Sequence, residues 1–206
     1  MIYVNTTGSG TGLIPSSPTN LTNALTMATC NSAVIKMEVG TYMINAPITN
    51  VTSFVTLEGG FNAGFTSKTS LAGATTIYRD NTNIQGLPQA GSLIAFKISN
   101  ASYFRFQDLT IEVQAPTAAN IANPYGVSTY CVYLNNSSNY NFVRCQIIAG
   151  NASAGLPGIN GTSGGVGANG TKGGDAGGNG GIGRAGNSIS PARTFWTQPI
   201  SSARAP

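Results

Sequence analysis

The residues from Phe96 to Ile147 contain one pattern twice, and this duplication restricts the possible folds more than any other feature. Shifting Phe96–Ile111 by thirty-six positions places it on Val132–Ile147 without a gap. Six apolar pairs and two polar pairs then coincide: Phe96/Val132, Ile98/Leu134, Phe104/Tyr140, Phe106/Phe142, Leu109/Cys145, Ile111/Ile147, Asn100/Asn136 and Ser102/Ser138. The apolar residues come in couples spaced by two, as in a strand with one buried face. Three couples separated by two corners make one turn of a coil, so we predict an all-β fold, a right-handed parallel β-helix.

The first thirty-two residues are predicted to form a strand and a helix that closes the coil. Ile2–Val4 is a short apolar strand, and Leu21, Ala24, Leu25 and Ala28 follow the spacing of one helical face. Ser17 before Pro18 predicts the start of that helix, with Ser17 as the N-cap. A helix here would cover the end of the core, where strand edges would otherwise recruit other chains.

The next segments carry a family resemblance. Val34–Tyr42 alternates with Ile35, Met37 and Val39 on one side, and Gly40 marks a corner. This I-x-M-x-V-G-T-Y strand, preceded by a helix and followed by V-T-L-E-G-G-F at Val55–Phe61, resembles the opening of pectin-lyase-like β-helix domains of large Bacteroidetes-type surface proteins. The resemblance covers Ile2 to about Asn151. It implies a bacterial extracellular or cell-surface location, an adhesin-like role, and export as cargo of the type IX route.

The division of the chain follows from a change in composition. We expect the terminal strand and helix in 1–32, the coils in 33–153, a Gly-x-x tract in 154–187, and a tail in 188–206 that continues in a longer protein. Glycine recurs every third residue from Gly155 to Gly173 and, after a slip of one, from Gly174 to Gly186. Such a tract suits glycine-rich legs of the polyproline II type packed beside the coil. Disorder is the alternative.

Composition excludes several classes of function. The formal charge is +4, but the basic residues are scattered singly, so we expect no nucleic-acid binding. No apolar run reaches the roughly eighteen residues of a membrane span. The chain has no histidine, which removes Ser/His and Cys/His nucleophiles and most zinc sites. We therefore expect neither a metal nor a cofactor.

The few acidic residues leave little material for catalysis. Glycoside cleavage needs two facing carboxylates, and the six acids of the chain are dispersed. The repeat places Asp108 opposite Arg144, which favours a ladder pair between adjacent coils over catalysis. Arg105, Asp108 and Arg144 are the candidate ligand contacts if an outward groove exists there. Glu58, in the Glu-Gly-Gly sequence, is interpreted as a turn residue.

The cysteines leave one alternative open. Cys145 aligns with Leu109, which favours a buried thiol that acts as a small apolar side chain. A Cys131–Cys145 bridge remains the alternative for an extracellular protein.

Three functions are consistent with these residues. The first is a non-enzymatic secreted or cell-surface β-helix that contacts surface polysaccharide, other cell-surface components or secretion machinery. The second is a carbohydrate-active, polysaccharide lyase-like or sugar-binding β-helix, and the third is a self-assembling fibre subunit. The missing catalytic set favours the first.

Overall fold

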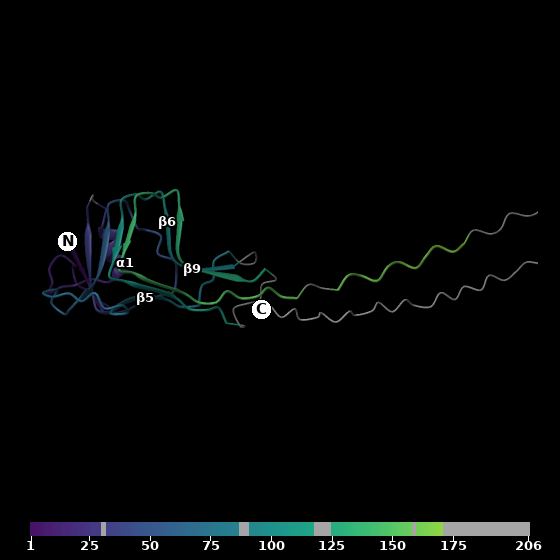
Figure 1. The fold of residues 1–206 in the computed structure, drawn as a ribbon, viewed down its shortest axis with the longest axis horizontal. Helices are drawn as coiled ribbons and strands as arrows, with labels where there is room; N and C mark the ends of the chain where they lie inside the picture. The colour runs from purple at the N-terminus through teal and green to yellow at the C-terminus, as the bar shows by residue number, and fades with distance from the viewer. Residues whose placement is uncertain (30–31, 87–90, 118–124, 158–159, 171–206) are drawn as a thin grey trace, which may run out of the picture. The chain divides into compact units, whose positions relative to one another are not determined.

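The computed structural model shows a parallel β-solenoid of about four turns with one helix (Figure 1). The structure describes residues 1–29, 32–86, 91–117, 125–157 and 160–170. One compact unit spans Met1–Asn160 and contains every helix and strand described below. No helix in the described ranges is long and apolar enough to cross a bilayer.

Three parallel sheets form the sides of the coil. Sheet A contains, in spatial order, β1 (Ile2–Val4), β2 (Val34–Glu38), β4 (Thr56–Phe61), β7 (Arg105–Gln107) and β10 (Asn141–Val143). Sheet B contains β3 (Gly40–Ile44), β5 (Thr75–Arg79), β8 (Thr110–Val113) and β11 (Gln146–Ala149). Sheet C pairs β6 (Gly91–Ser99) with β9 (Val127–Asn135), and Ile48 extends it through a bridge to Phe96.

The register of the last two coils is the one that the duplication predicts. Phe96 pairs with Val132 in sheet C, Phe106 with Phe142 in sheet A, and Ile111 with Ile147 in sheet B. Each side of the coil therefore advances by the same thirty-six residues.

The interior is a column of apolar side chains stacked along the coil axis. Phe96, Phe104 and Phe106 are fully buried, and the Phe106 ring lies 4.8 Å from that of Phe96 and 5.7 Å from that of Phe104, between centroids. Ile35 and Met37 are buried as predicted, whereas Val39 is 41 % exposed. The prediction for Val39 was wrong because β2 ends at Glu38 and the chain turns before Gly40, which has φ 143°.

The corners repeat a left-handed backbone conformation at equivalent positions. Asn100 and Asn136 have φ 56° and 48°, and the Asn136 side-chain amide donates to Asn100 Oδ1 at 2.7 Å. Asp108 and Arg144 have φ 53° and 50° at the corner from sheet A to sheet B. Asn adopts this conformation more readily than most residues, which explains its place at the corner from sheet C to sheet A.

The three corners contain very different lengths of chain. In the last two coils only Asp108–Leu109 and Arg144–Cys145 separate sheet A from sheet B. Sheets B and C are joined by the longer segments 80–90 and 114–126 in these coils, and an earlier corner from sheet A to sheet B, between β4 and β5, contains residues 62–74.

The helix begins later than predicted. Helix α1 spans Leu21–Met27, and its N-cap is Asn20, whose Oδ1 accepts from Asn23 N at 2.9 Å. Ser17 cannot cap a helix that starts at Pro18, because Thr19 is held extended in a parallel bridge to Val4. The apolar face of the helix is as predicted, with Leu21, Ala24 and Leu25 buried.

The cysteines and the glycine tract complete the description. Cys131 is buried, Cys145 is half-buried, and both are free thiols, so the alternative of a bridge between them is not realised. Burial raises the pKa of each thiol.

Residues 161–170 form no helix or strand and are exposed, and no atom of a described residue outside the immediate neighbours lies within 4 Å of the Cβ position of the glycines there. The rest of the predicted Gly-x-x tract and the tail, 171–206, lies outside the described residues.

Candidate functional site

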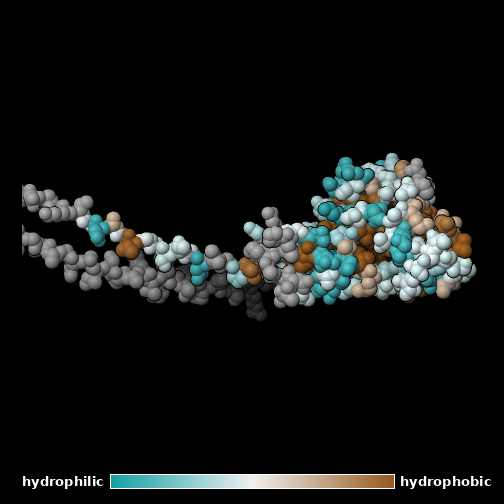
Figure 2. Space-filling model, turned by 180° about the vertical axis from the view of Figure 1, so that it is seen from behind, coloured by the Kyte–Doolittle hydropathy of each residue, from teal (hydrophilic) through white to brown (hydrophobic). Residues whose placement is uncertain are grey.

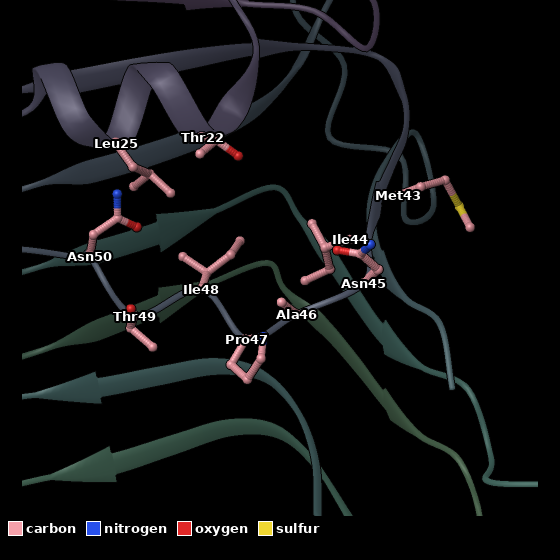
Figure 3. A pocket seen from close by; sticks show the side chains of 10 residues that line it. All are labelled: Thr22, Leu25, Met43, Ile44, Asn45, Ala46, Pro47, Ile48, Thr49 and Asn50. Atoms are coloured by element: carbon pink, nitrogen blue, oxygen red, sulfur yellow. The ribbon is translucent and has the colours of Figure 1, made fainter. Parts of the chain in front are cut away.

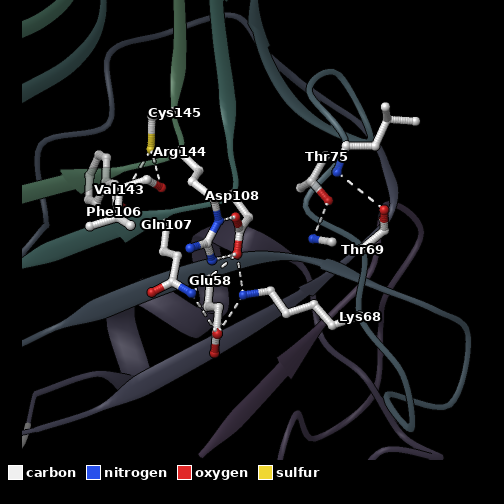
Figure 4. Close-up of polar contacts among 12 residues, drawn as sticks. Glu58, Lys68, Thr69, Thr75, Phe106, Gln107, Asp108, Val143, Arg144 and Cys145 are labelled. Atoms are coloured by element: carbon white, nitrogen blue, oxygen red, sulfur yellow. Dashed lines mark hydrogen bonds and ion pairs between the residues drawn. The ribbon is translucent and has the colours of Figure 1, made fainter.

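Four charged side chains and one side-chain amide form a connected chain across sheet A and its corner with sheet B (Figure 4). It consists of Glu58 in β4, Lys68 in the loop after β4, Gln107 at the end of β7, and Asp108 and Arg144 at the corners of consecutive coils. We call these five residues the charge ladder. Their signs alternate along the coil axis in the order Glu58, Lys68, Asp108, Arg144.

Asp108 is the centre of the charge ladder. Its carboxylate is 1 % exposed and accepts from Arg144 Nε at 2.5 Å and from Arg144 Nη2 at 2.8 Å. Lys68 Nζ forms an ion pair with the same carboxylate, and Gln107 Nε2 donates to Oδ2 at 3.2 Å. The hydrogen bonds from Arg144 hold the pKa of Asp108 well below its usual value, against the opposite effect of burial. The predicted ladder pair of Asp108 and Arg144 is therefore confirmed.

Glu58 is bound in the same way. Lys68 Nζ donates to Glu58 Oε1 at 2.6 Å, and Gln107 Nε2 lies 3.3 Å from the same oxygen. The interpretation of Glu58 as a turn residue was wrong, because it lies inside β4 as the Cα partner of Gln107. Both carboxylates of the charge ladder are thus paired with a cation. The charge ladder stabilises contacts between coils and presents no unpaired carboxylate for chemistry.

The other candidate contact, Arg105, stands apart from the charge ladder. It is exposed in β7 and is the Cα partner of Thr56 and Asn141. Among the described residues no ion pair involves Arg105. The structure therefore joins Asp108 to Arg144 and leaves Arg105 on the outer face of sheet A. Sequence reasoning missed Lys68, which reaches Asp108 from the loop that the Phe61–Lys68 bridge folds back onto β4.

Arg79 is a buried cation with a structural role. Arg79 lies at the end of β5 and is 0 % exposed. Its guanidinium donates to Asp80 Oδ1 at 2.8 Å and to the carbonyl oxygens of Thr82 and Asn83 at 2.7 and 3.1 Å. Burial lowers the pKa of Arg79, and Asp80 opposes this. These bonds fix the chain where it leaves β5.

A cleft of about 450 Å³ lies between α1 and the segment Ile44–Asn50 (Figure 3). Thr22 and Leu25 of the helix line one side, and Ile48, whose backbone pairs with sheet C, lines the other. None of the lining residues is charged, so this cleft offers no acid, base or nucleophilic pair.

A second cleft, of about 290 Å³, lies on the outer face of sheet C. Tyr130 and Tyr133 are 40 % and 42 % exposed and meet edge to face at 6.0 Å between ring centroids. Lys97, the Cα partner of Tyr133, and the apolar Ile94, the Cα partner of Tyr130, complete the walls. We call these four residues the tyrosine cleft. Sequence reasoning missed it because Tyr130 precedes the repeated window Val132–Ile147 and Tyr133 lies between two of its apolar positions.

The comparisons with known proteins add no further constraint. No family model matches the chain, and neither a curated protein nor a solved structure is significantly similar to it. Among the described residues no three His, Cys, Asp or Glu side chains lie close enough together to hold a metal ion. The chemistry of the site must therefore be argued from its own residues.

Proposed function

We propose that the chain is a non-enzymatic module of a secreted or cell-surface bacterial protein, in which a right-handed coil serves as a rigid scaffold for adhesion. One observation carries the proposal: the charged side chains that the fold brings together, Glu58, Lys68, Asp108 and Arg144, neutralise one another across coils. An acid–base catalytic site would leave at least one carboxylate available to substrate, whereas Glu58 and Asp108 are both paired.

Two structural features support a scaffold role. Adjacent coils are joined by backbone pairing on all three sides and by side-chain ladders at the corners, such as Ser102 Oγ to Ser138 Oγ at 2.9 Å. We also propose that α1 covers the N-terminal end of the core, since its buried face is apolar and the outer edge of β1 is taken by Thr19. The family resemblance adds export by the type IX route and contact with secretion machinery to this proposal.

Two measurements test the proposal. Protease treatment of intact producing cells should remove the protein from the cell surface. The purified protein should release no unsaturated oligosaccharides from polyuronates in the presence of Ca²⁺. Turnover that survives purification to homogeneity would overturn the non-enzymatic assignment. Protection of the protein inside intact cells would overturn its location.

The tyrosine cleft favours a second candidate, a sugar-binding module. Exposed aromatic rings stack on the apolar faces of sugars, and the Lys97 ammonium could pair with a carboxylate group. Titration with soluble bacterial polysaccharides should give binding that Tyr130→Ala or Tyr133→Ala weakens at least tenfold. Tyr103→Ala is the matched control, because Tyr103 is 57 % exposed and lies outside the tyrosine cleft.

A further inference from the structure

The three sheets end together at the last coil, and no described strand covers that end of the core. Strands β9, β10 and β11 are terminal in sheets C, A and B, and each pairs along its length with only one described strand. We call the surface formed by residues 127–149 the terminal coil. A strand edge of this kind offers backbone donors and acceptors to another extended chain.

Apolar side chains that are core in the previous coil are uncovered in the terminal coil. Phe104 and Ile111 are fully buried, whereas their equivalents Tyr140 and Ile147 are 43 % and 51 % exposed. Val132, Leu134, Phe142 and Cys145 are likewise only half-buried against the core. Figure 2 shows that brown patches interrupt a mainly white and teal surface on the face of the molecule that it views.

The charge ladder indicates the charge of a group that would bind at this end of the coil. Its signs alternate up to Arg144, which has Asp108 on its inner side and whose side chain is still 53 % exposed. The next position along the axis therefore favours a carboxylate.

Two other occupants of this end fit it less well. Residues 127–149 contain no Asp or Glu, so a second copy joined through the same surface would bring Arg144 and no acid. A second copy cannot continue sheet A from its other end, because Thr19 already occupies the outer edge of β1. After Gly150 the sequence contains no third copy of the apolar pattern.

We propose that the terminal coil binds an extended polypeptide of a partner protein. This segment adds one more parallel layer, places apolar residues at alternate positions over Phe142 and Ile147, and sets a carboxylate against Arg144. The proposed contacts are made by Phe142, Arg144 and Ile147, none of which lines the tyrosine cleft, so the inference does not depend on the function of that cleft.

The chain itself supplies the probe. The stretch 101–115, Ala-Ser-Tyr-Phe-Arg-Phe-Gln-Asp-Leu-Thr-Ile-Glu-Val-Gln-Ala, is the layer that stacks beneath the terminal coil. A fluorescein-labelled peptide of this sequence should bind the full chain saturably and place its aspartate against Arg144. The same peptide with Asp108→Lys should bind roughly tenfold more weakly, which corresponds to the loss of one well-placed charge pair.

Variants of the protein separate the contributions of charge and apolar contact. Arg144→Glu should reverse the preference between the two peptides, and Ile147→Lys should weaken binding of both at least tenfold. Leu71→Lys is the matched control, because Leu71 is 72 % exposed in a different loop and should leave binding unchanged.

Amide hydrogen exchange shows whether the surface is available. In the free chain, alternate amides of Asn141–Ala149 should exchange rapidly, and the peptide should slow them. Slow exchange in the dilute free chain would mean that residues of the same chain cover the terminal coil. Dimers in sedimentation that Ile147→Lys dissociates would assign the surface to a second copy. Either result would overturn the proposal. Equal affinity of the protein for the peptide and for its Asp108→Lys variant would also overturn it.

Discussion

Arg144 lies one coil beyond Asp108 and forms two hydrogen bonds with its carboxylate, from Nε at 2.5 Å and from Nη2 at 2.8 Å. Asp108→Asn keeps the size of the side chain but removes the charge that Arg144 and Lys68 share. We expect the free energy of unfolding to fall by about 1.5–3 kcal/mol, the range for hydrogen bonds to charged groups. Urea denaturation measures this change.

Glu112→Gln provides the control for that experiment. Glu112 lies in β8 and takes part in no ion pair with a described residue. Its substitution should change stability by no more than about 0.5 kcal/mol. Equal effects of the two substitutions would show that the charge ladder does not stabilise the fold.

The lowered pKa of Asp108 predicts an acid-dependent part of stability. Hydrogen bonds from Arg144 are its first cause, so the folded state binds this proton less readily than the unfolded chain. The stabilisation is therefore fully present above the unfolded pKa of about 3.9 and declines as the pH falls below that value towards the folded pKa. The difference in stability between the wild type and Asp108→Asn should shrink below about pH 4. A difference that grows on acidification would contradict this sign.

Gly60 is the glycine whose replacement should cost most. It has φ 87°, and an added Cβ would clash with the carbonyl oxygen of Thr69, which belongs to the same loop as Lys68. Gly60→Ala combines backbone strain with a steric clash and should cost about 3 kcal/mol or more. Gly64 has the same φ of 87° with no atom within 4 Å, so Gly64→Ala should cost only the strain, about 1 kcal/mol. Thermal unfolding of both variants separates the two contributions, and equal losses would exclude the clash.

Phe106 and Phe142 occupy the same position in consecutive coils but differ in burial. Phe106 is fully buried among Phe96, Phe104 and Phe142, so Phe106→Ala should cost about 3–5 kcal/mol. Phe142 is half-buried in the terminal coil, and Phe142→Ala should cost about half as much, because its side chain removes less apolar area from water. Chemical denaturation of the two variants measures both losses in the free energy of unfolding. A larger loss at Phe142 would mean that the terminal coil is covered.

The sequence was sufficient for the register of the last two coils and insufficient for the contacts made by irregular segments. The pairs Asn100/Asn136 and Asp108/Arg144 followed from one shift of the sequence, because both corners have equal length in the two coils. The contact of Lys68 with Asp108 could not be predicted, because it depends on how a loop folds back. The predicted start of α1 was wrong for a similar reason, since the bridge of Thr19 to Val4 is a tertiary contact.

The unequal corners have a consequence for insertion and deletion. One residue added between Gln107 and Thr110 would turn the side chains of β8 that face the interior towards the solvent, since strand residues alternate in direction. One residue added within 114–126 would change only the length of a connection between sheets B and C. This connection already differs in length from the equivalent connection in the preceding coil, residues 80–90. A foreign peptide grafted at 114–126 should therefore be displayed beside the coil without altering the stacking of the layers.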